Sequence, residues 1–131
     1  MIALAGSLTL LAAAVHGIGG HLMVVRGVTV DRLPPTPFGP AALTRTMLVV
    51  SWHLTTVGFL AAGCSMVAAG TLLDGAGAQA VAVAGASQVT ACAAVIVGLG
   101  AALTRSPRFV FRHPAPLLVT LTAVLAWVGA T

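Results

Sequence analysis

Long apolar segments alternate with short polar connections along the whole chain. Residues 2–25, 46–73 and 75–104 contain no Asp, Glu, Lys or Arg. About 20 apolar residues are enough for a helix to cross the hydrocarbon core of a bilayer. The pattern therefore predicts an all-α chain of membrane-spanning helices, at residues 2–25, 40–71, 78–104 and 113–130.

Prolines mark the ends of these helices, and glycines mark the places where two helices are expected to pack closely. Three prolines between residues 33 and 38 exclude a helix there, because proline lacks the amide donor and restricts the residue before it. Pro40 suits the first position of the second helix. Gly17 and Gly20 predict a close approach of a neighbouring helix, so replacing either by leucine is expected to destabilise the packing.

The composition supports one membrane domain over residues 1–131. The chain is 59% hydrophobic and only 6% charged, whereas a soluble domain is usually about 25% charged. The only acidic residues, Asp31 and Asp74, lie in predicted loops, so the chain offers no carboxylate pair for acid–base catalysis and no classical enzyme is expected. Cys64 and Cys92 form no CxxC motif and are expected to be packing residues.

The arginines predict the topology of the chain in the membrane. All of them flank or form the first and third connections, at positions 26, 32, 45, 105, 108 and 112. By the positive-inside rule both connections are cytoplasmic. The prediction is a polytopic four-helix bundle in a bacterial inner membrane, with both termini outside (N-out/C-out). Because they flank apolar runs, the arginines indicate topology rather than binding to nucleic acid.

Histidines inside apolar helices are the candidate functional residues. A polar side chain in hydrocarbon is costly and marks a functional-site hypothesis by default. In the predicted topology His16 and His53 lie at equal depth, while His21 and His113 form a second layer near the cytoplasmic surface. His16 and His21 are five residues apart, about 140° around an α-helix, so they are not expected to point at one centre unaided.

Binding of a cofactor or metal is one hypothesis for these residues. His16 and His53 can ligate a haem b iron axially, or a copper or zinc ion, with Trp52 as a wall of the pocket. Arginines at the cytoplasmic side can meet haem propionates. The candidate cofactor-binding residues are His16, His21, Arg26, Arg45, Trp52, His53 and His113, with His16 and His53 as metal ligands.

Two further hypotheses remain open. Histidine changes charge near neutral pH, so His16 with Ser51, Thr55, Thr56 and Gln88 can form a polar chain that handles protons or a quinone. In the favoured hypothesis the histidines hydrogen-bond across helices and fix the packing. The protein is then a small subunit or scaffold of a larger membrane complex, with lipids and other membrane subunits or further copies as partners. A small oligomeric transporter is the remaining alternative.

The arrangement resembles small bacterial four-helix integral membrane proteins of unassigned function. Their pattern is a histidine late in the first helix, a basic and proline-containing connection, an arginine followed by Trp-His in the second helix, and His-Pro opening the fourth. The matching residues are His16, Arg26, Arg45, Trp52, His53, His113 and Pro114. The resemblance implies the fold and a shared role of these positions, and it implies no activity.

Overall fold

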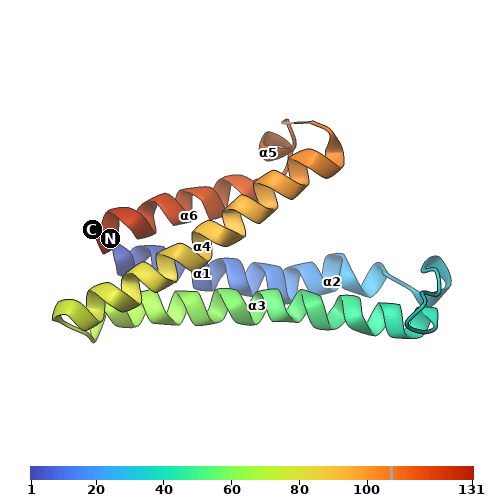
Figure 1. Cartoon of the computed structure of the whole chain (residues 1–131), viewed down its shortest axis with the longest axis horizontal. Helices are drawn as coiled ribbons and strands as arrows, with labels where there is room; N and C mark the ends of the chain where they lie inside the picture. The colour runs from blue at the N-terminus through green and yellow to red at the C-terminus, as the bar shows by residue number, and fades with distance from the viewer. Residues whose placement is uncertain (107) are drawn as a thin grey trace.

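The computed structural model describes residues 1–106 and 108–131, and these residues are helical over most of their length (Figure 1). The first helical stretch begins as α1 (Ile2–Ala14), continues as the π-helical segment η1 (Val15–Gly20) and ends in α2 (His21–Met23). The later helices are α3 (Ala41–Thr71), α4 (Gly75–Thr104), the short α5 (Phe109–Arg112) and α6 (Pro114–Ala130). The predicted all-helical class is confirmed for the described residues.

Some helix ends differ from the prediction, and the backbone explains why. Helix α4 begins at Gly75 rather than at residue 78, so the turn after α3 is shorter than predicted. Gly75 takes a φ of +62°, which glycine adopts without steric cost, where the chain turns into α4. Pro40 is the residue before α3, extended at ψ 163°, rather than the first helical residue. The first connection holds two 3-10 turns, η2 (Val25–Gly27) and η3 (Val30–Arg32). Pro107, in the second basic connection, lies outside the described residues.

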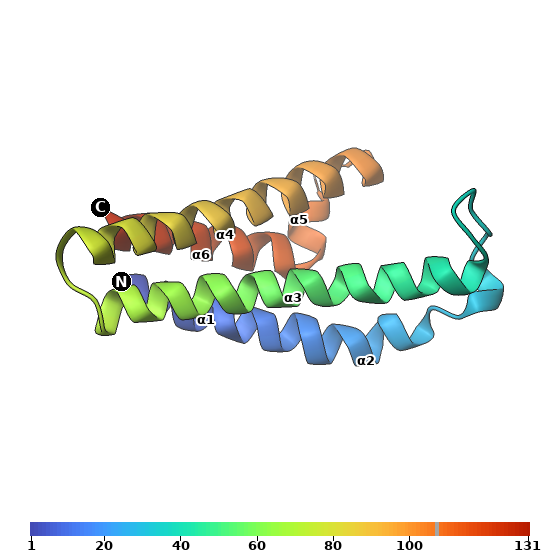
Figure 2. The ribbon, with the colours of Figure 1, turned by 60° about the horizontal axis from the view of Figure 1, so that its bottom comes forward.

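The long helices pack in a closed sequence of neighbours, in which α1 contacts α3, α3 contacts α4, α4 contacts α6, and α6 returns to α1. Figures 1 and 2 show α1 and α3 running side by side, while α4 leads away from α3 toward its own C-terminal end. Both termini and the α3–α4 turn lie at one end of the molecule, and the connection between α2 and α3 lies at the other (Figure 1).

Small residues form much of the interior, with a few larger side chains such as Met66 and Phe59 among them, and large apolar residues cover the exterior. Ala5, Ala86 and Ala126 are fully buried, whereas large side chains such as Leu54 and Val57 are more than half exposed. A side chain at Gly6 would meet the backbone of α3 at the Gly63 carbonyl oxygen, 2.8 Å away. The glycines therefore allow α1 and α3 to approach closely, as membrane helices commonly do.

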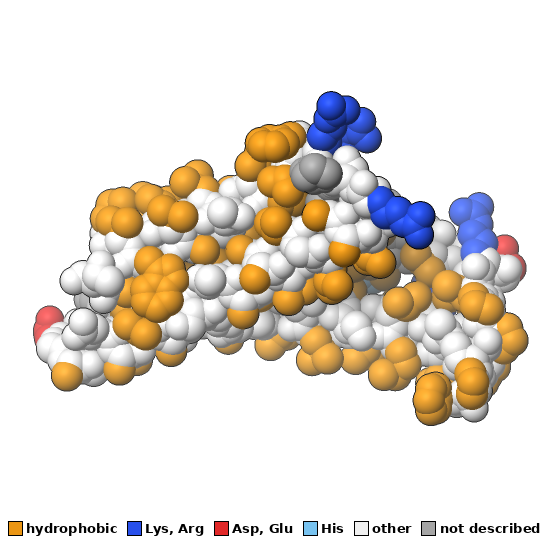
Figure 3. Space-filling view, turned by 45° about the horizontal axis from the view of Figure 1, so that its top comes forward, with side chains coloured by type: hydrophobic (Ala, Val, Ile, Leu, Met, Phe, Trp, Pro, Cys, Tyr) orange, Lys and Arg blue, Asp and Glu red, His pale blue; other side chains and the backbone are white. Residues whose placement is uncertain are grey.

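The exterior suits a lipid environment. Among the described residues, three helical stretches are long and apolar enough to cross a membrane, namely Ile2–Gly27, Ala41–Thr71 and Gly75–Thr104, and α6 is a shorter apolar helix. Figure 3 shows hydrophobic side chains over the visible face and arginines toward one end. Soluble monomers rarely expose so much contiguous apolar surface, so the structure supports a membrane protein.

Candidate functional site

The π-helical segment Val15–Gly20 brings two histidines toward α3. Its sequence, Val-His-Gly-Ile-Gly-Gly, is half glycine, and glycine weakens the α-helix. Hydrogen bonds in a π-helix span five residues instead of four, so side chains five apart lie near the same face. His16 and His21 both reach α3 for this reason. The predicted 140° separation assumed an uninterrupted α-helix, which the π-helical segment interrupts.

His16 and Trp52 form a two-way clasp between the first helical stretch and α3. The His16 ring stacks on the indole with centroids 4.3 Å apart and planes within 9° of parallel. Trp52 Nε1 donates to the His16 carbonyl oxygen at 3.0 Å, and His16 Nε2 lies 3.3 Å from the Trp52 carbonyl oxygen. Phe59 adds an edge-on contact to the His16 ring. The clasp fixes the backbone on both helices immediately beside His53.

His21 and His53 face each other across the same interface. His21 Nδ1 lies 3.1 Å from His53 Nε2, and both side chains are half-buried. The ring centroids are 5.1 Å apart, well beyond the nitrogen separation, so the rings meet at their nitrogen-bearing edges. We call His16, His21, Trp52 and His53 the histidine cluster.

The partner of His53 differs from the one that depth alone predicted. The sequence placed His53 level with His16 and assigned His21 to a layer with His113. In the structure Gly17 faces Thr56 and Gly20 faces Trp52. In this antiparallel register His53 lies level with Gly19 and Gly20, directly before His21, and its Nε2 meets His21 Nδ1 rather than His16.

The other candidate residues lie outside the histidine cluster. Arg45 Nε donates to the Val28 carbonyl oxygen at 2.9 Å and so ties the first connection to α3. Arg26 is exposed in η2. His113 precedes α6, where its Nδ1 accepts a 3.2 Å hydrogen bond from the Ala115 amide. These contacts give Arg45 and His113 local structural roles.

The cluster does not present His16 and His53 as axial ligands of one haem. Axial ligation needs two imidazole nitrogens aimed at one iron from opposite sides of a flat macrocycle. His16 instead lies flat on Trp52 with its Nε2 near a backbone carbonyl, and His53 Nε2 faces His21. The residues therefore do not fit a haem between His16 and His53 in this arrangement.

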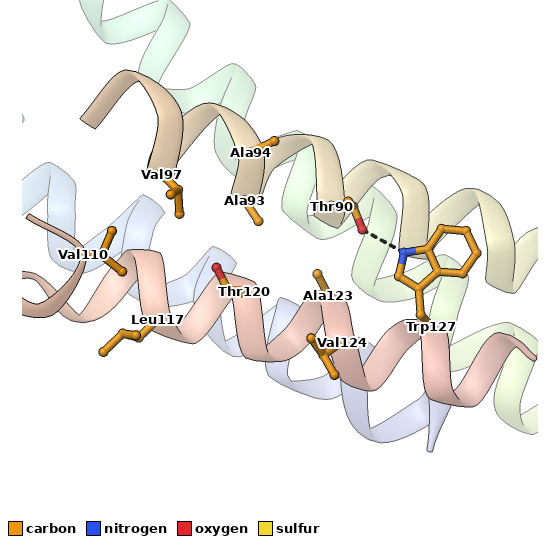
Figure 4. Close-up of a pocket in the computed structure, with 10 residues that line it drawn as sticks. All are labelled: Thr90, Ala93, Ala94, Val97, Val110, Leu117, Thr120, Ala123, Val124 and Trp127. Carbon is orange, nitrogen blue, oxygen red and sulfur yellow. Dashed lines mark hydrogen bonds between the residues drawn. The ribbon is translucent and has the colours of Figure 1, made fainter. Parts of the chain in front are cut away.

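A second polar contact lies in a groove between α4 and α6. Trp127 Nε1 donates a 2.9 Å hydrogen bond to Thr90 Oγ1 (Figure 4). The groove has a volume of about 470 Å³ and is otherwise lined mainly by apolar side chains. No signal in the sequence pointed to the pairing of Trp127 with Thr90.

Interhelical hydrogen bonds also join α3 to α4. Gln88 Nε2 donates to the Gly58 carbonyl oxygen at 2.8 Å. Within residues 1–106 and 108–131, no group of three or more His, Cys, Asp or Glu side chains is placed to hold a metal ion.

No protein-family model, curated protein or solved structure matches this chain.

Proposed function

We propose that this protein is a small subunit of a larger assembly in a bacterial inner membrane. In this proposal four helices cross the bilayer, α6 being the fourth, and both termini lie outside. The apolar exterior and the arginines near one end support this topology. The partner is another transmembrane helix, contributed by a different subunit or by a second copy of this chain.

The observation that carries the proposal is a stripe of small residues on α4. Its members recur every three or four residues, and all of them are exposed: Ala80, Ala84, Ser87, Ala91, Ala94, Gly98 and Ala102. At about 3.6 residues per turn this spacing keeps the stripe on one side of the helix. The buried residues Ala82, Ala86 and Val89 lie on the opposite side.

A stripe of this kind favours contact with a helix over contact with lipid. Without a hydrophobic driving force in the bilayer, transmembrane helices associate through close packing of small residues. A Cβ at Gly98 would meet no neighbouring atom of the described residues within 4 Å, so the space beside the stripe is open to a partner. The large apolar residues Val95 and Leu99 flank it and suit lipid.

The test compares assemblies extracted from the native membrane with a mild detergent and separated by native electrophoresis. The wild-type chain is expected to migrate as a complex larger than its detergent-bound monomer. The double substitution Ala91→Leu and Gly98→Leu fills the stripe and should release the monomer. Ala61→Leu, on the exposed side of α3, is the matched control and should leave the complex intact. A monomeric wild type, or a complex that survives the double substitution, would contradict the proposal.

A further inference from the structure

The edge-to-edge meeting of His21 and His53 has the geometry of two ligands of one metal ion. Ligand nitrogens lie about 2.0–2.1 Å from a tetrahedral zinc ion, which sets two such nitrogens about 3.3–3.4 Å apart. The observed separation of His21 Nδ1 and His53 Nε2 is 3.1 Å. A shift of a few tenths of an ångström, together with a rotation of the rings that aims both lone pairs at one point, would therefore admit a metal between them.

We infer that His21 and His53 form an open binding site for a late first-row transition-metal ion, Cu²⁺ or Zn²⁺. This inference is independent of the subunit role proposed above. Imidazole nitrogen suits both ions, and a nitrogen site binds Cu²⁺ more tightly than Zn²⁺ by the Irving–Williams order. The two protein ligands leave more positions to water or a small ligand than the single open position of a catalytic zinc site.

The metal replaces a hydrogen bond in this inference. Without the ion, one of the two facing nitrogens carries a proton and donates it to the other. When the ion binds, both facing nitrogens offer lone pairs, and each neutral ring keeps its proton on its other nitrogen. The tautomeric change leaves both histidines neutral, so no carboxylate is needed to balance a proton.

The surroundings hold both ligands in place while leaving the ion access. Trp52 precedes His53 directly and is fixed by its two-way clasp with His16. His21 follows the π-helical segment, whose altered turn directs it to α3. π-Bulges are frequent at functional sites. Both histidines are half-buried rather than sealed, so neither ring is closed off from an ion in the surroundings.

The experiment uses the full chain, purified in mild detergent through a tag without histidine. Cu²⁺ is titrated into the protein, and its electron paramagnetic resonance spectrum reports coupling to nitrogen ligands. The wild type is expected to bind one Cu²⁺ with a spectrum showing coordinated nitrogen. His21→Gln and His53→Gln should each weaken the affinity at least tenfold, since even residues that only orient metal ligands change it 10–100-fold. Zn²⁺ should compete more weakly than Cu²⁺.

The matched control is His113→Asn, which removes a histidine outside the cluster and keeps a side chain suited to cap α6. It should bind Cu²⁺ as the wild type does. Equal affinity in the wild type and in the His21→Gln/His53→Gln double variant would overturn the inference, as would equal losses in the His113→Asn variant. A wild-type Cu²⁺ spectrum without nitrogen coupling would overturn it independently of how the variants fold.

Discussion

Trp52 Nε1 donates a 3.0 Å hydrogen bond to the carbonyl oxygen of His16, and the His16 ring lies stacked on the same indole. The indole of Trp52 thus contacts both the backbone and the side chain of a residue on another helix. Interhelical polar contacts in membranes average about 0.6 kcal/mol, and aromatic stacking adds about 0.5–1.5 kcal/mol. The clasp therefore contributes to stability and also positions the neighbouring His53.

Replacing Trp52 by phenylalanine separates these two contributions. The Trp52→Phe chain keeps an aromatic face for His16 but loses the Nε1 donor, so we expect a loss of about 0.5–1.5 kcal/mol. Unfolding in mixed micelles with rising SDS measures this change. Trp127→Phe removes a comparable donor at the α4–α6 groove and serves as the reference. An unchanged SDS midpoint for Trp52→Phe would show that the hydrogen bond stabilises nothing.

At Gly20, the Trp52 indole leaves no room for a side chain. A Cβ at this position would collide with Trp52 Cζ2, whereas a Cβ at Gly19 would meet nothing within 4 Å. We expect Gly20→Ala to destabilise the chain by about 1–3 kcal/mol through overpacking. Gly19→Ala should be neutral or stabilising, because alanine favours a helix over glycine. Thermal unfolding of both variants in detergent tests this, and equal midpoints would contradict the close approach.

Gln88 joins α4 to α3 through its bond to the Gly58 carbonyl oxygen. Gln88→Met keeps the length of the side chain and removes the donor, so we expect a loss of about 0.6 kcal/mol, the average for such bonds in membranes. Gln79→Met, near the start of the same helix and exposed, is the control and should change little. The SDS midpoint is again the readout. A larger effect at Gln79 than at Gln88 would count against the hydrogen bond.

The proposed topology has a direct test in reporter fusions. A reporter placed after Thr131 should signal from outside the cytoplasm, while one inserted in the connection between α2 and α3 should signal from the cytoplasm. The physical reason is the gathering of arginines in the two connections and their absence from the termini. A cytoplasmic signal from Thr131 would show that the C-terminus lies inside. It would also contradict the assignment of both arginine-containing connections to the cytoplasm.

The helices themselves were predictable because length and apolarity dominate the sequence. Residues 46–73 and 75–104 carry no charge, and the structure places α3 and α4 over most of them. Helix ends were less predictable, since they depend on individual backbone angles such as the positive φ of Gly75. Propensity alone does not reveal whether a glycine starts a helix or precedes one.

The histidine cluster was predictable in composition but not in pairing. The sequence singled out His16, His21, Trp52 and His53. It did not reveal the π-helical turn, because the glycines of residues 17–20 are equally typical of close packing. It also did not reveal the register of α1 against α3, which depends on which glycine faces Thr56 and which faces Trp52. A depth estimate has an error of a few residues, enough to exchange His16 for His21.

The register of the first helical stretch against α3 determines every contact of the histidine cluster, and a disulfide tests it directly. A Cβ at Gly17 would lie 3.5 Å from Thr56 Cβ, within the range of about 3.5–4.5 Å that a disulfide requires. In a background with Cys64→Ser and Cys92→Ser, we predict that Gly17→Cys/Thr56→Cys oxidises to an intrachain disulfide in the membrane. Gly17→Cys/Thr55→Cys should stay reduced, because Thr55 lies about 100° around α3 from Thr56 and its side chain is exposed rather than packed against the first helical stretch. A disulfide in the Thr55 pair but not in the Thr56 pair would contradict the register and the histidine cluster with it.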